Sequence, residues 1–393
     1  MIDARNTNEG KDAKQMFFRK GNVARAVLVD TEPKVIAEAI TQEHKNWSYG
    51  KNMDVCEQTG SGNNWAFGSR VHAKTLRKPV SNLIRKAAEE MDSLPSFLIL
   101  QSVAGGTGSG VGTDITEMIR DEYGDSTIVN AAVFPYESGE VIVQNYNAVL
   151  TLSELTQLSD GVILFENTRI HEMCSKLLRI ARPSFKDLNV AIASQLGSIL
   201  FPSTSSQGGL SSIPETLCAH PGYRLLTARS IPQVPERSKA FTVRTWNGLL
   251  KHMHQMLIAD SVLEEGIDWK VNLKSRGLNK SIATRLTLRG ADVEDVDVNL
   301  MFQRPELYVP WSLDSFRCLR SSRAFQSHER SISMLSNSQS VLSPLTRSLS
   351  KAWDMFHTGA YVHQYREHGV EDGDFVAALI RMEQVLENYR GLS

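Results

Sequence analysis

Short apolar runs alternate along the chain with stretches in which apolar residues recur every three or four positions. The runs predict strands buried on both faces of a sheet, and the helical spacing predicts amphipathic helices between them. Strand–helix–strand order implies parallel strands and right-handed crossovers, so the pattern indicates an α/β fold. The predicted strands are 24–29, 97–103, 127–134, 161–166, 223–226, 242–244 and 282–289; the predicted helices are 35–40, 80–91, 111–123, 150–155, 168–179, 184–200, 246–259, 352–356 and 375–389.

A glycine-rich loop follows the predicted strand 97–103. It holds four glycines within six residues: Gly105, Gly106, Gly108 and Gly110. Such a loop exposes backbone N–H groups at a helix N-terminus, where the helix dipole favours an anion. It lacks the Gly-Lys-Ser/Thr of a P-loop and the Gly-x-Gly-x-x-Gly of dinucleotide-binding folds. The pattern favours phosphate binding and leaves open a turn that only lets strand and helix pack closely.

Three other segments carry candidate chemistry. Asp30 and Glu32 follow the strand 24–29, where acids can hold a hydrated magnesium ion or a phosphate-bound water; the alternative is a helix cap. The segment 60–68 suits a tight turn with accessible N–H groups, or a surface turn anchored by a tryptophan. Phe185 and Asn189 share one helix face and could stack on and hydrogen-bond a base, or could be a core ring beside an exposed amide.

Composition narrows the functional classes. The 393 residues carry a formal net charge of −1, which gives no reason to expect a nucleic-acid partner. Four scattered cysteines form no C-x-x-C pair, so neither a disulfide framework nor a zinc site is expected. We expect the protein to reside in a reducing compartment. No apolar run approaches 18 residues, so we expect an intracellular protein without membrane insertion.

The sequence Ala-Gly-Gly-Thr-Gly-Ser-Gly at 104–110 resembles the signature loop of the tubulin family, and further motifs follow in the order of that family over nearly all of the chain. The resemblance implies a tubulin-like fold of class α/β, with a Rossmann-type parallel-sheet GTPase domain. It also implies a core helix, an α+β intermediate domain and C-terminal helices. The corresponding segments are 1–183, 184–201, 202–345 and 346–393.

The same resemblance implies GTP and Mg²⁺ as ligands. It assigns the phosphates to Ala104, Gly105, Gly106, Thr107, Gly108, Ser109, Gly62 and Asn63. It assigns the ribose and base to Glu140, Gln144, Asn167, Phe185 and Asn189, and indirect magnesium binding through water to Asp30 and Glu32. Conventional tubulins usually have acids at both 140 and 144 and mostly tyrosine at 185, so this chain departs from them at Gln144 and Phe185.

The segments 24–36, 139–147, 248–258 and 264–269 resemble the centriolar branch of the family, and the chain end lacks a glutamate-rich tail. This implies a role in triplet microtubules of centrioles and basal bodies and in cilia or flagella. The implied partners are other tubulins and centriolar proteins. The implied locations are the cytoplasm, cytoskeleton, centrosome and cilium basal body, with the nucleus left open.

Nothing before Ala24 resembles the first strand and phosphate loop of the family, so we expect a truncated domain with weakened nucleotide and magnesium binding and reduced stability. No catalytic residue is assigned, because the position that should carry an acid is near Ser212 and the nearest acid is Glu215. GTP binding is therefore favoured over efficient hydrolysis. The alternatives are a nucleotide-free structural subunit of the centriole and, remotely, a dinucleotide-dependent oxidoreductase.

Overall fold

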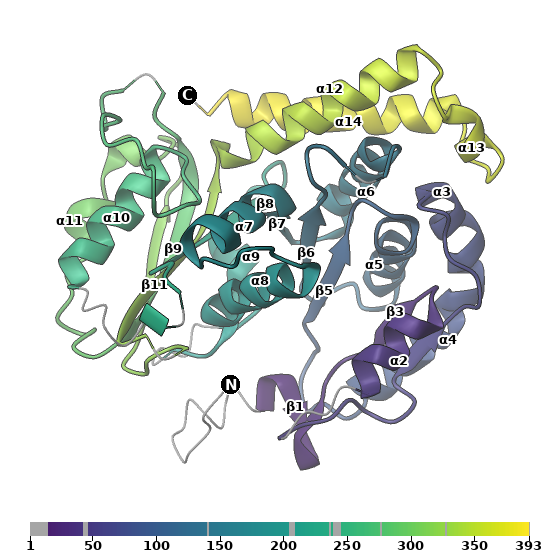
Figure 1. Ribbon diagram of the computed structural model, residues 1–393, viewed down its shortest axis with the longest axis horizontal. Helices are drawn as coiled ribbons and strands as arrows, with labels where there is room; N and C mark the ends of the chain where they lie inside the picture. The colour runs from purple at the N-terminus through teal and green to yellow at the C-terminus, as the bar shows by residue number, and fades with distance from the viewer. Residues whose placement is uncertain are drawn as a thin grey trace. The chain divides into compact units, whose positions relative to one another are not determined.

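The computed structural model describes residues 15–41, 46–139, 141–203, 209–235, 237–238, 245–275, 277–326 and 328–392. The chain divides into two compact units, which are labelled by element in Figure 1. We call Ile2–Asp160 with Thr346–Gln384 the N-terminal unit, and Gly161–Leu345 with Val385–Ser393 the C-terminal unit. The predicted division at 183, 201 and 345 remains a prediction.

The N-terminal unit contains two parallel strand pairs and a short hairpin. Strand β3 (Leu28–Asp30) runs parallel to β4 (Asp54–Cys56), with Val29 opposite Val55. Strand β5 (Phe97–Ser102) runs parallel to β6 (Ile128–Phe134), with Ile99 opposite Asn130. The hairpin joins β1 (Phe18–Arg19) and β2 (Val23–Ala24). Parallel pairing requires long crossovers, which the helices of this unit supply.

Helices cover one face of these strands. Leu76, Val80 and Ile84 recur every four residues on α4 and pack with Met118 and Ile119 of α5 in one apolar cluster. The helices and helical turns are α2 (Pro33–Thr41), α3 (Trp65–Phe67), η2 (Gly68–His72), α4 (Ala73–Ala88), η3 (Thr107–Val111), α5 (Gly112–Glu122), α6 (Gln144–Leu158) and α13 (Val362–Arg366). Two longer helices, α12 (Leu342–His357) and α14 (Asp372–Arg390), run side by side (Figure 1) and continue into the sequence of the C-terminal unit. In the N-terminal unit, Trp353 Nε1 donates to Glu383 Oε1 at 2.7 Å.

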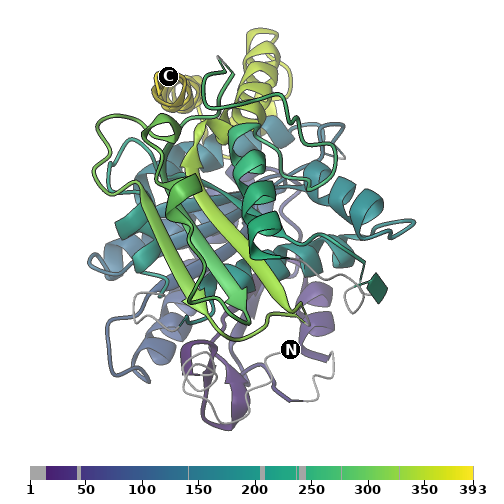
Figure 2. The same ribbon diagram turned by 90° about the vertical axis from the view of Figure 1, so that its left-hand side faces the viewer.

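Within its described residues the C-terminal unit has five strands in the order β10-β9-β11-β8-β7. They are β7 (Gly161–Glu166), β8 (Leu225–Ile231), β9 (Ser281–Gly290), β10 (Phe316–Ser321) and β11 (Arg330–Ser338). Strand β11 is antiparallel to both β8 and β9, whereas β7 is parallel to β8 and β10 is parallel to β9. Figure 2 shows the long strands β9 and β11 side by side with α10 (Trp246–Ile258) next to them.

An apolar core joins α10 to these strands. Met253, Met256 and Leu257 of α10 pack with Leu286 of β9 and Met334 of β11, all of them buried. The remaining helical segments are α7 (Asn167–Glu172), η4 (Met173–Leu177), α8 (Phe185–Leu200), α9 (Ser212–Leu217), α11 (Asn299–Phe302), η6 (Pro305–Leu307) and η7 (Gln339–Val341). Among the residues that the structure describes, no helix has the length and hydropathy to cross a membrane.

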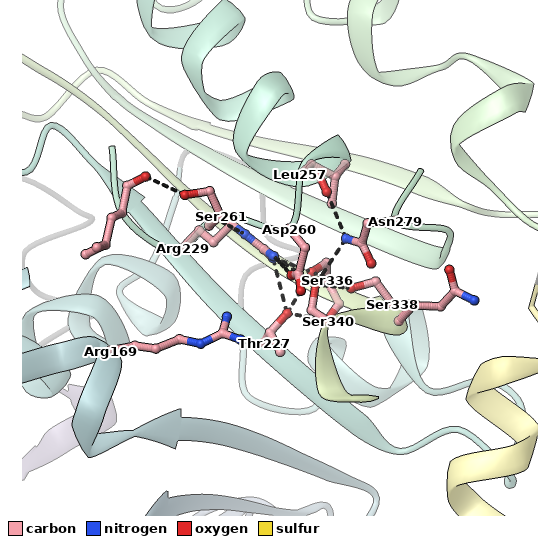
Figure 3. A network of polar contacts seen from close by, with 12 residues as sticks. Arg169, Thr227, Arg229, Leu257, Asp260, Ser261, Asn279, Ser336, Ser338 and Ser340 are labelled. Carbon is pink, nitrogen blue, oxygen red and sulfur yellow. Dashed lines mark hydrogen bonds and ion pairs between the residues drawn. The ribbon is translucent and has the colours of Figure 1, made fainter. Parts of the chain in front are cut away.

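A buried arginine joins the strands of this unit through polar contacts (Figure 3). Arg229 of β8 has a fully buried side chain and pairs with Asp260 at 2.8 Å. It also donates to the backbone oxygen of Ser261 at 2.8 Å, and to the hydroxyls of Ser336 and Ser340 at 3.1 and 2.8 Å. Burial lowers the pKa of Arg229, and Asp260 opposes that shift. Each donor group therefore has a partner, as a buried cation requires.

The α/β prediction is confirmed, and several element boundaries are corrected. The predicted helix 80–91 begins at Ala73, because the buried face of α4 extends to Ala73 and Leu76. Strand β4 lies between the predicted elements 35–40 and 80–91, where no strand was predicted, and the predicted strand 24–29 is divided between β2 and β3. The predicted strand 242–244 lies outside the described residues.

The prediction that strand 97–103 is buried on both faces is wrong. Leu100 is 66% exposed, although Ile99 beside it packs in the cluster formed by α4 and α5. Successive side chains of a strand point to opposite faces, so only one face of β5 is covered within this unit. An apolar run alone could not distinguish a strand covered on one face from one covered on both.

Candidate nucleotide-binding site

Three loops of the N-terminal unit meet through hydroxyl groups. Thr31 follows β3, Ser61 precedes α3, and Thr107 begins the helical turn after β5. The hydroxyls of Thr31 and Thr107 are 2.6 Å apart, and the Ser61 hydroxyl lies 3.2 Å from the former and 3.0 Å from the latter. Two of these loops leave the carboxyl ends of parallel strands, the position at which open α/β sheets bind ligands.

Close backbone packing explains some of the glycines. A Cβ atom on Gly106 would lie 2.7 Å from the Asn64 carbonyl oxygen, and one on Gly110 would lie 2.3 Å from that of Trp65. Any other residue would force these backbones apart. Gly105 differs, because its nearest neighbour is the side-chain oxygen of Asn63 at 3.3 Å. Packing therefore requires Gly106 and Gly110 but does not require Gly105.

Asn147 of α6 holds two of the loops together. Its Nδ2 donates to the carbonyl oxygens of Asn63 and Ala104 at 2.8 and 2.7 Å. Its Oδ1 accepts from the Trp65 N–H at 2.9 Å and from the Tyr365 hydroxyl at 2.6 Å. Burial raises the pKa of Tyr365 well above its ordinary value, which keeps this hydroxyl a donor. One fully buried amide thus fixes the position of both loops.

The predicted phosphate residues differ in accessibility. Gly62 and Asn63 are exposed and have φ angles of +56° and +52°, as expected of a tight turn. Four residues are partly exposed: Ala104, Gly105, Thr107 and Gly108. Gly106 and Ser109 are buried, and the Ser109 hydroxyl donates to the carbonyl oxygen of Gly105. In this conformation the Ser109 hydroxyl is engaged within its own loop, whereas the Thr107 hydroxyl contacts the hydroxyls of Thr31 and Ser61 on the two neighbouring loops.

The two predicted magnesium residues lie at the start of α2. Asp30 Oδ1 accepts from the N–H groups of Thr31 at 2.7 Å and Glu32 at 3.1 Å, both of which precede the first residue of α2, so it fixes the turn before the helix and does not bond the N–H groups of the helix itself. Glu32 is exposed and approaches Gly60. Across the part of the chain that the structure describes, no group of three His, Cys, Asp or Glu side chains could hold a metal by itself. Any magnesium here would need oxygen ligands from water or phosphate as well.

The predicted ribose residues lie around the start of α6. Gln144 is buried, and its Nε2 donates to the Tyr136 carbonyl oxygen at 2.9 Å. Its side chain therefore closes the loop that precedes α6. Glu140 lies outside the described residues.

The predicted base residues belong to the C-terminal unit. Asn167 begins α7 at the end of β7, and Phe185 and Asn189 lie one turn apart on α8. Phe185 is 53% exposed and Asn189 is exposed, so the alternative of a core phenylalanine is wrong. The start of α8 is fixed by a capping box, in which Ser184 and Asp187 bond reciprocally. Hydrogen bonds from Ser184 lower the pKa of Asp187.

The region expected to lack a catalytic acid is the start of α9. Ser212 is buried; its hydroxyl donates to the Gly209 carbonyl oxygen at 2.6 Å and accepts from Arg285 at 3.0 Å. Glu215 is exposed in the first turn of α9, where a negatively charged side chain interacts favourably with the helix dipole. Both placements have structural explanations that require no catalysis.

Sequence reasoning missed Asn147 and the hydroxyls of Thr31 and Ser61 as loop-joining groups. The available signal was the polar content of α6, in which Asn147, Thr151 and Ser153 are all buried. A buried polar residue needs a partner, so its presence indicated a contact without showing which loop supplies it.

A model of the "Tubulin/FtsZ family, GTPase domain" matches residues 1–175. A tubulin delta chain of Canis lupus familiaris is 42% identical, over 97% of this chain and 90% of the relative. That of Homo sapiens is also 42% identical, over 96% and 90%. A tubulin beta chain of Cicer arietinum is 27% identical, over 94% and 81%. The higher identity to the delta chains bears out the resemblance seen in segments such as 24–36 and 139–147, and the chain belongs to the tubulin family.

Proposed function

We propose that this chain is a delta-tubulin-like, GTP-binding cytoskeletal protein that acts in centriole and basal body triplet microtubules and in the assembly of cilia or flagella. Membership of a GTPase family and high identity to delta chains support the proposal. The observation that carries nucleotide binding is the meeting of three loops at Thr31, Ser61 and Thr107, next to a helix N-terminus.

The loop after β5 would hold phosphate. The first N–H groups of a helix have no partner within the helix and attract an anion, so the N–H groups of 105–108 and the Thr107 hydroxyl are the proposed donors. Gly62 and Asn63 would add N–H groups from the neighbouring turn. Asp30 and Glu32 would orient the waters of a magnesium ion, which GTP brings with its phosphates.

The ribose and base residues are proposed on the family resemblance. Gln144 and Glu140 would contact the ribose, and Asn167 and Asn189 would read the guanine edge through their amides. Phe185 would stack on the base; its exposed ring supports that role. Binding serves assembly in this proposal, because no residue is assigned to orient an attacking water. The proposed partners are other tubulins and centriolar proteins at centrosomes and basal bodies.

The second candidate is a nucleotide-free structural subunit. It is favoured because polar groups of the loops already form hydrogen bonds with one another. The three hydroxyls contact one another, the Ser109 hydroxyl donates to the Gly105 carbonyl oxygen, and Asn147 donates to both loops. A packed junction of this kind needs no ligand to complete its hydrogen bonds.

Titration of the purified chain with GTP, GDP and NAD in the presence of Mg²⁺ separates these candidates. Saturable GTP binding without NAD binding supports the first, and binding of neither ligand supports the structural subunit. NAD binding without GTP binding would support the remaining alternative, a dinucleotide-dependent oxidoreductase.

Substitution of the stacking residue tests the base site. Phe185→Ala should weaken GTP binding by roughly 5- to 150-fold, because stacking on an aromatic side chain contributes about 1–3 kcal/mol per base. Val190→Ala is the matched control, since Val190 is similarly exposed on the same helix and has no proposed role. Equal affinities of the two variants would remove Phe185 from the site.

A further inference from the structure

One buried arginine of strand β9 lacks the kind of partners that Arg229 and Arg289 have. Along β9, Leu286 packs in the core with α10, so Arg285 and Arg289 lie on the opposite face of the sheet. Arg289 donates to three backbone carbonyl oxygens at the end of α8. Arg229 is paired with the carboxylate of Asp260. Arg285 is as deeply buried as these two arginines and has neither kind of compensation.

The guanidinium group of Arg285 makes a single hydrogen bond in the described part of the chain. Its Nη1 donates to the hydroxyl oxygen of Ser212, at the start of α9, at 3.0 Å. Its Nε is buried and has no hydrogen-bond partner. The N–H of Nε and one N–H of Nη2 point in the same direction from one edge of the planar guanidinium, an arrangement that matches the two oxygens of a carboxylate. This edge of Arg285 is therefore left without an acceptor.

Arg285 also lacks a counter-charge. Burial, with a smaller contribution from Arg317, lowers the pKa of Arg285 to about 10, so the guanidinium remains charged at neutral pH. Arg317 lies directly beside it in the register of β10 and β9, and is itself paired with Asp314 at 2.6 Å. Among the residues that the structure describes, no carboxylate acts on the pKa of Arg285. One buried positive charge thus remains uncompensated, which is unfavourable in a protein interior.

We propose that Arg285 binds a small free carboxylate ion through Nε and Nη2, while the Ser212 hydroxyl holds the guanidinium through Nη1. A single negative charge suits this site, because only the charge of Arg285 is uncompensated, and two coplanar oxygens match the guanidinium edge. The burial of Arg285 admits only a small ion. The Arg317 side chain is 35% exposed, so this face of the sheet reaches solvent beside β10. The site does not depend on the proposed nucleotide binding.

The probe is acetate, a carboxylate that carries only a methyl group. The full chain is dialysed into a buffer without carboxylates and unfolded by heat at increasing concentrations of sodium acetate, with sodium chloride of equal ionic strength as the reference. Acetate should raise the unfolding midpoint by a few degrees and the rise should saturate, because a ligand that binds only the folded chain stabilises it. The NMR line of carbon-labelled acetate should also broaden when the chain is added.

Three variants test the contacts of the site. Arg285→Met should abolish both acetate responses, and without acetate it should be at least as stable as the parent, because it removes an uncompensated buried charge. Arg285→Lys keeps the charge but loses one of the two charge-assisted hydrogen bonds, so it should weaken acetate binding by about tenfold or more. Arg304→Met is the matched control, since it removes a surface arginine of the same unit that pairs with Glu306. Its acetate responses should equal those of the parent.

Four outcomes would overturn the proposal. The absence of a saturable rise with acetate would show that water alone solvates Arg285. Equal rises for the parent and Arg285→Met would show that acetate acts elsewhere. A rise with chloride as large as that with acetate, and lost in Arg285→Met, would show that the site accepts any small monovalent anion. If Arg285→Met in carboxylate-free buffer is destabilised as strongly as Arg229→Met, Arg285 already has a partner within the protein and the site does not exist.

Discussion

In the C-terminal unit β11 has a strand on each side, whereas in the N-terminal unit β3 and β5 each pair along one edge only among the described residues. The C-terminal strands are joined by continuous backbone pairing and by the buried contacts of Arg229. The N-terminal strand pairs are joined instead by the apolar cluster that includes residues of α4 and α5, and by loop contacts through Asn147 and Thr107.

This difference distinguishes the parts of the protein that stabilise the fold from the parts that can still bind a ligand. A sheet whose backbone groups are all paired has little to offer a ligand, because each polar group already has a partner. Loops joined by a few side chains can open or rearrange with a smaller loss of free energy. The loops proposed for phosphate binding are thus joined by side-chain contacts of Thr107 and Asn147.

The largest effect is expected from breaking the C-terminal network. Arg229→Met should lower the free energy of unfolding by about 3–5 kcal/mol, since it leaves the Asp260 carboxylate and several buried acceptors without their donor. The measurement is the midpoint of urea unfolding. Arg390→Met is the control, because its partner Glu387 lies at the surface and such pairs contribute little. Similar midpoints for both variants would contradict the role given to the network.

Removing the loop-joining amide tests the N-terminal side of the comparison. Asn147→Leu should cost about 2–4 kcal/mol, because it leaves two carbonyl oxygens and the Trp65 N–H unpaired in a buried place. It should also weaken any GTP binding, since both loops lose their support. Tyr365→Phe removes only one of the four bonds and should cost about 1 kcal/mol. If the two variants unfold at the same urea concentration, Asn147 does not hold the loops.

A smaller effect is expected from crowding the glycine loop. Gly110→Ala places a Cβ atom 2.3 Å from the Trp65 carbonyl oxygen and should destabilise the chain by about 1–3 kcal/mol. Gly124→Ala is the control, because its nearest neighbour would be 3.9 Å away. Thermal unfolding compares the two. A Gly110→Ala protein as stable as the control would indicate that the loop is not tightly packed.

The smallest effect concerns pH and a partly buried histidine of the C-terminal unit. Burial and, to a lesser extent, Arg304 lower the pKa of His254, so the unfolded chain binds a proton more readily than the folded one. Stability should therefore fall as the pH drops through about 6.5, the ordinary histidine pKa. His254→Phe keeps a ring against Phe302 and should reduce this loss between pH 7 and 5. Parallel pH profiles of variant and parent would show that His254 does not contribute.

The sequence predicted the helices and strands with strong periodicity, including α10 and β9. It also located the glycine loop, because glycine spacing is visible without tertiary contacts. It could not predict that β5 is covered on one face only, since Leu98 and Leu100 read as core residues. Nor could it assign Asn147 or Arg229 a partner, because their contacts join segments far apart in sequence.

Hydrogen exchange of the glycine loop with and without nucleotide tests the central claim most directly. If the loop after β5 binds phosphate, adding GTP with Mg²⁺ should slow exchange at the amides of Gly105, Thr107 and Gly108, while the amides of β11 stay unchanged. Unchanged exchange at these loop amides with excess GTP would contradict the claim and favour a packed loop in a nucleotide-free subunit.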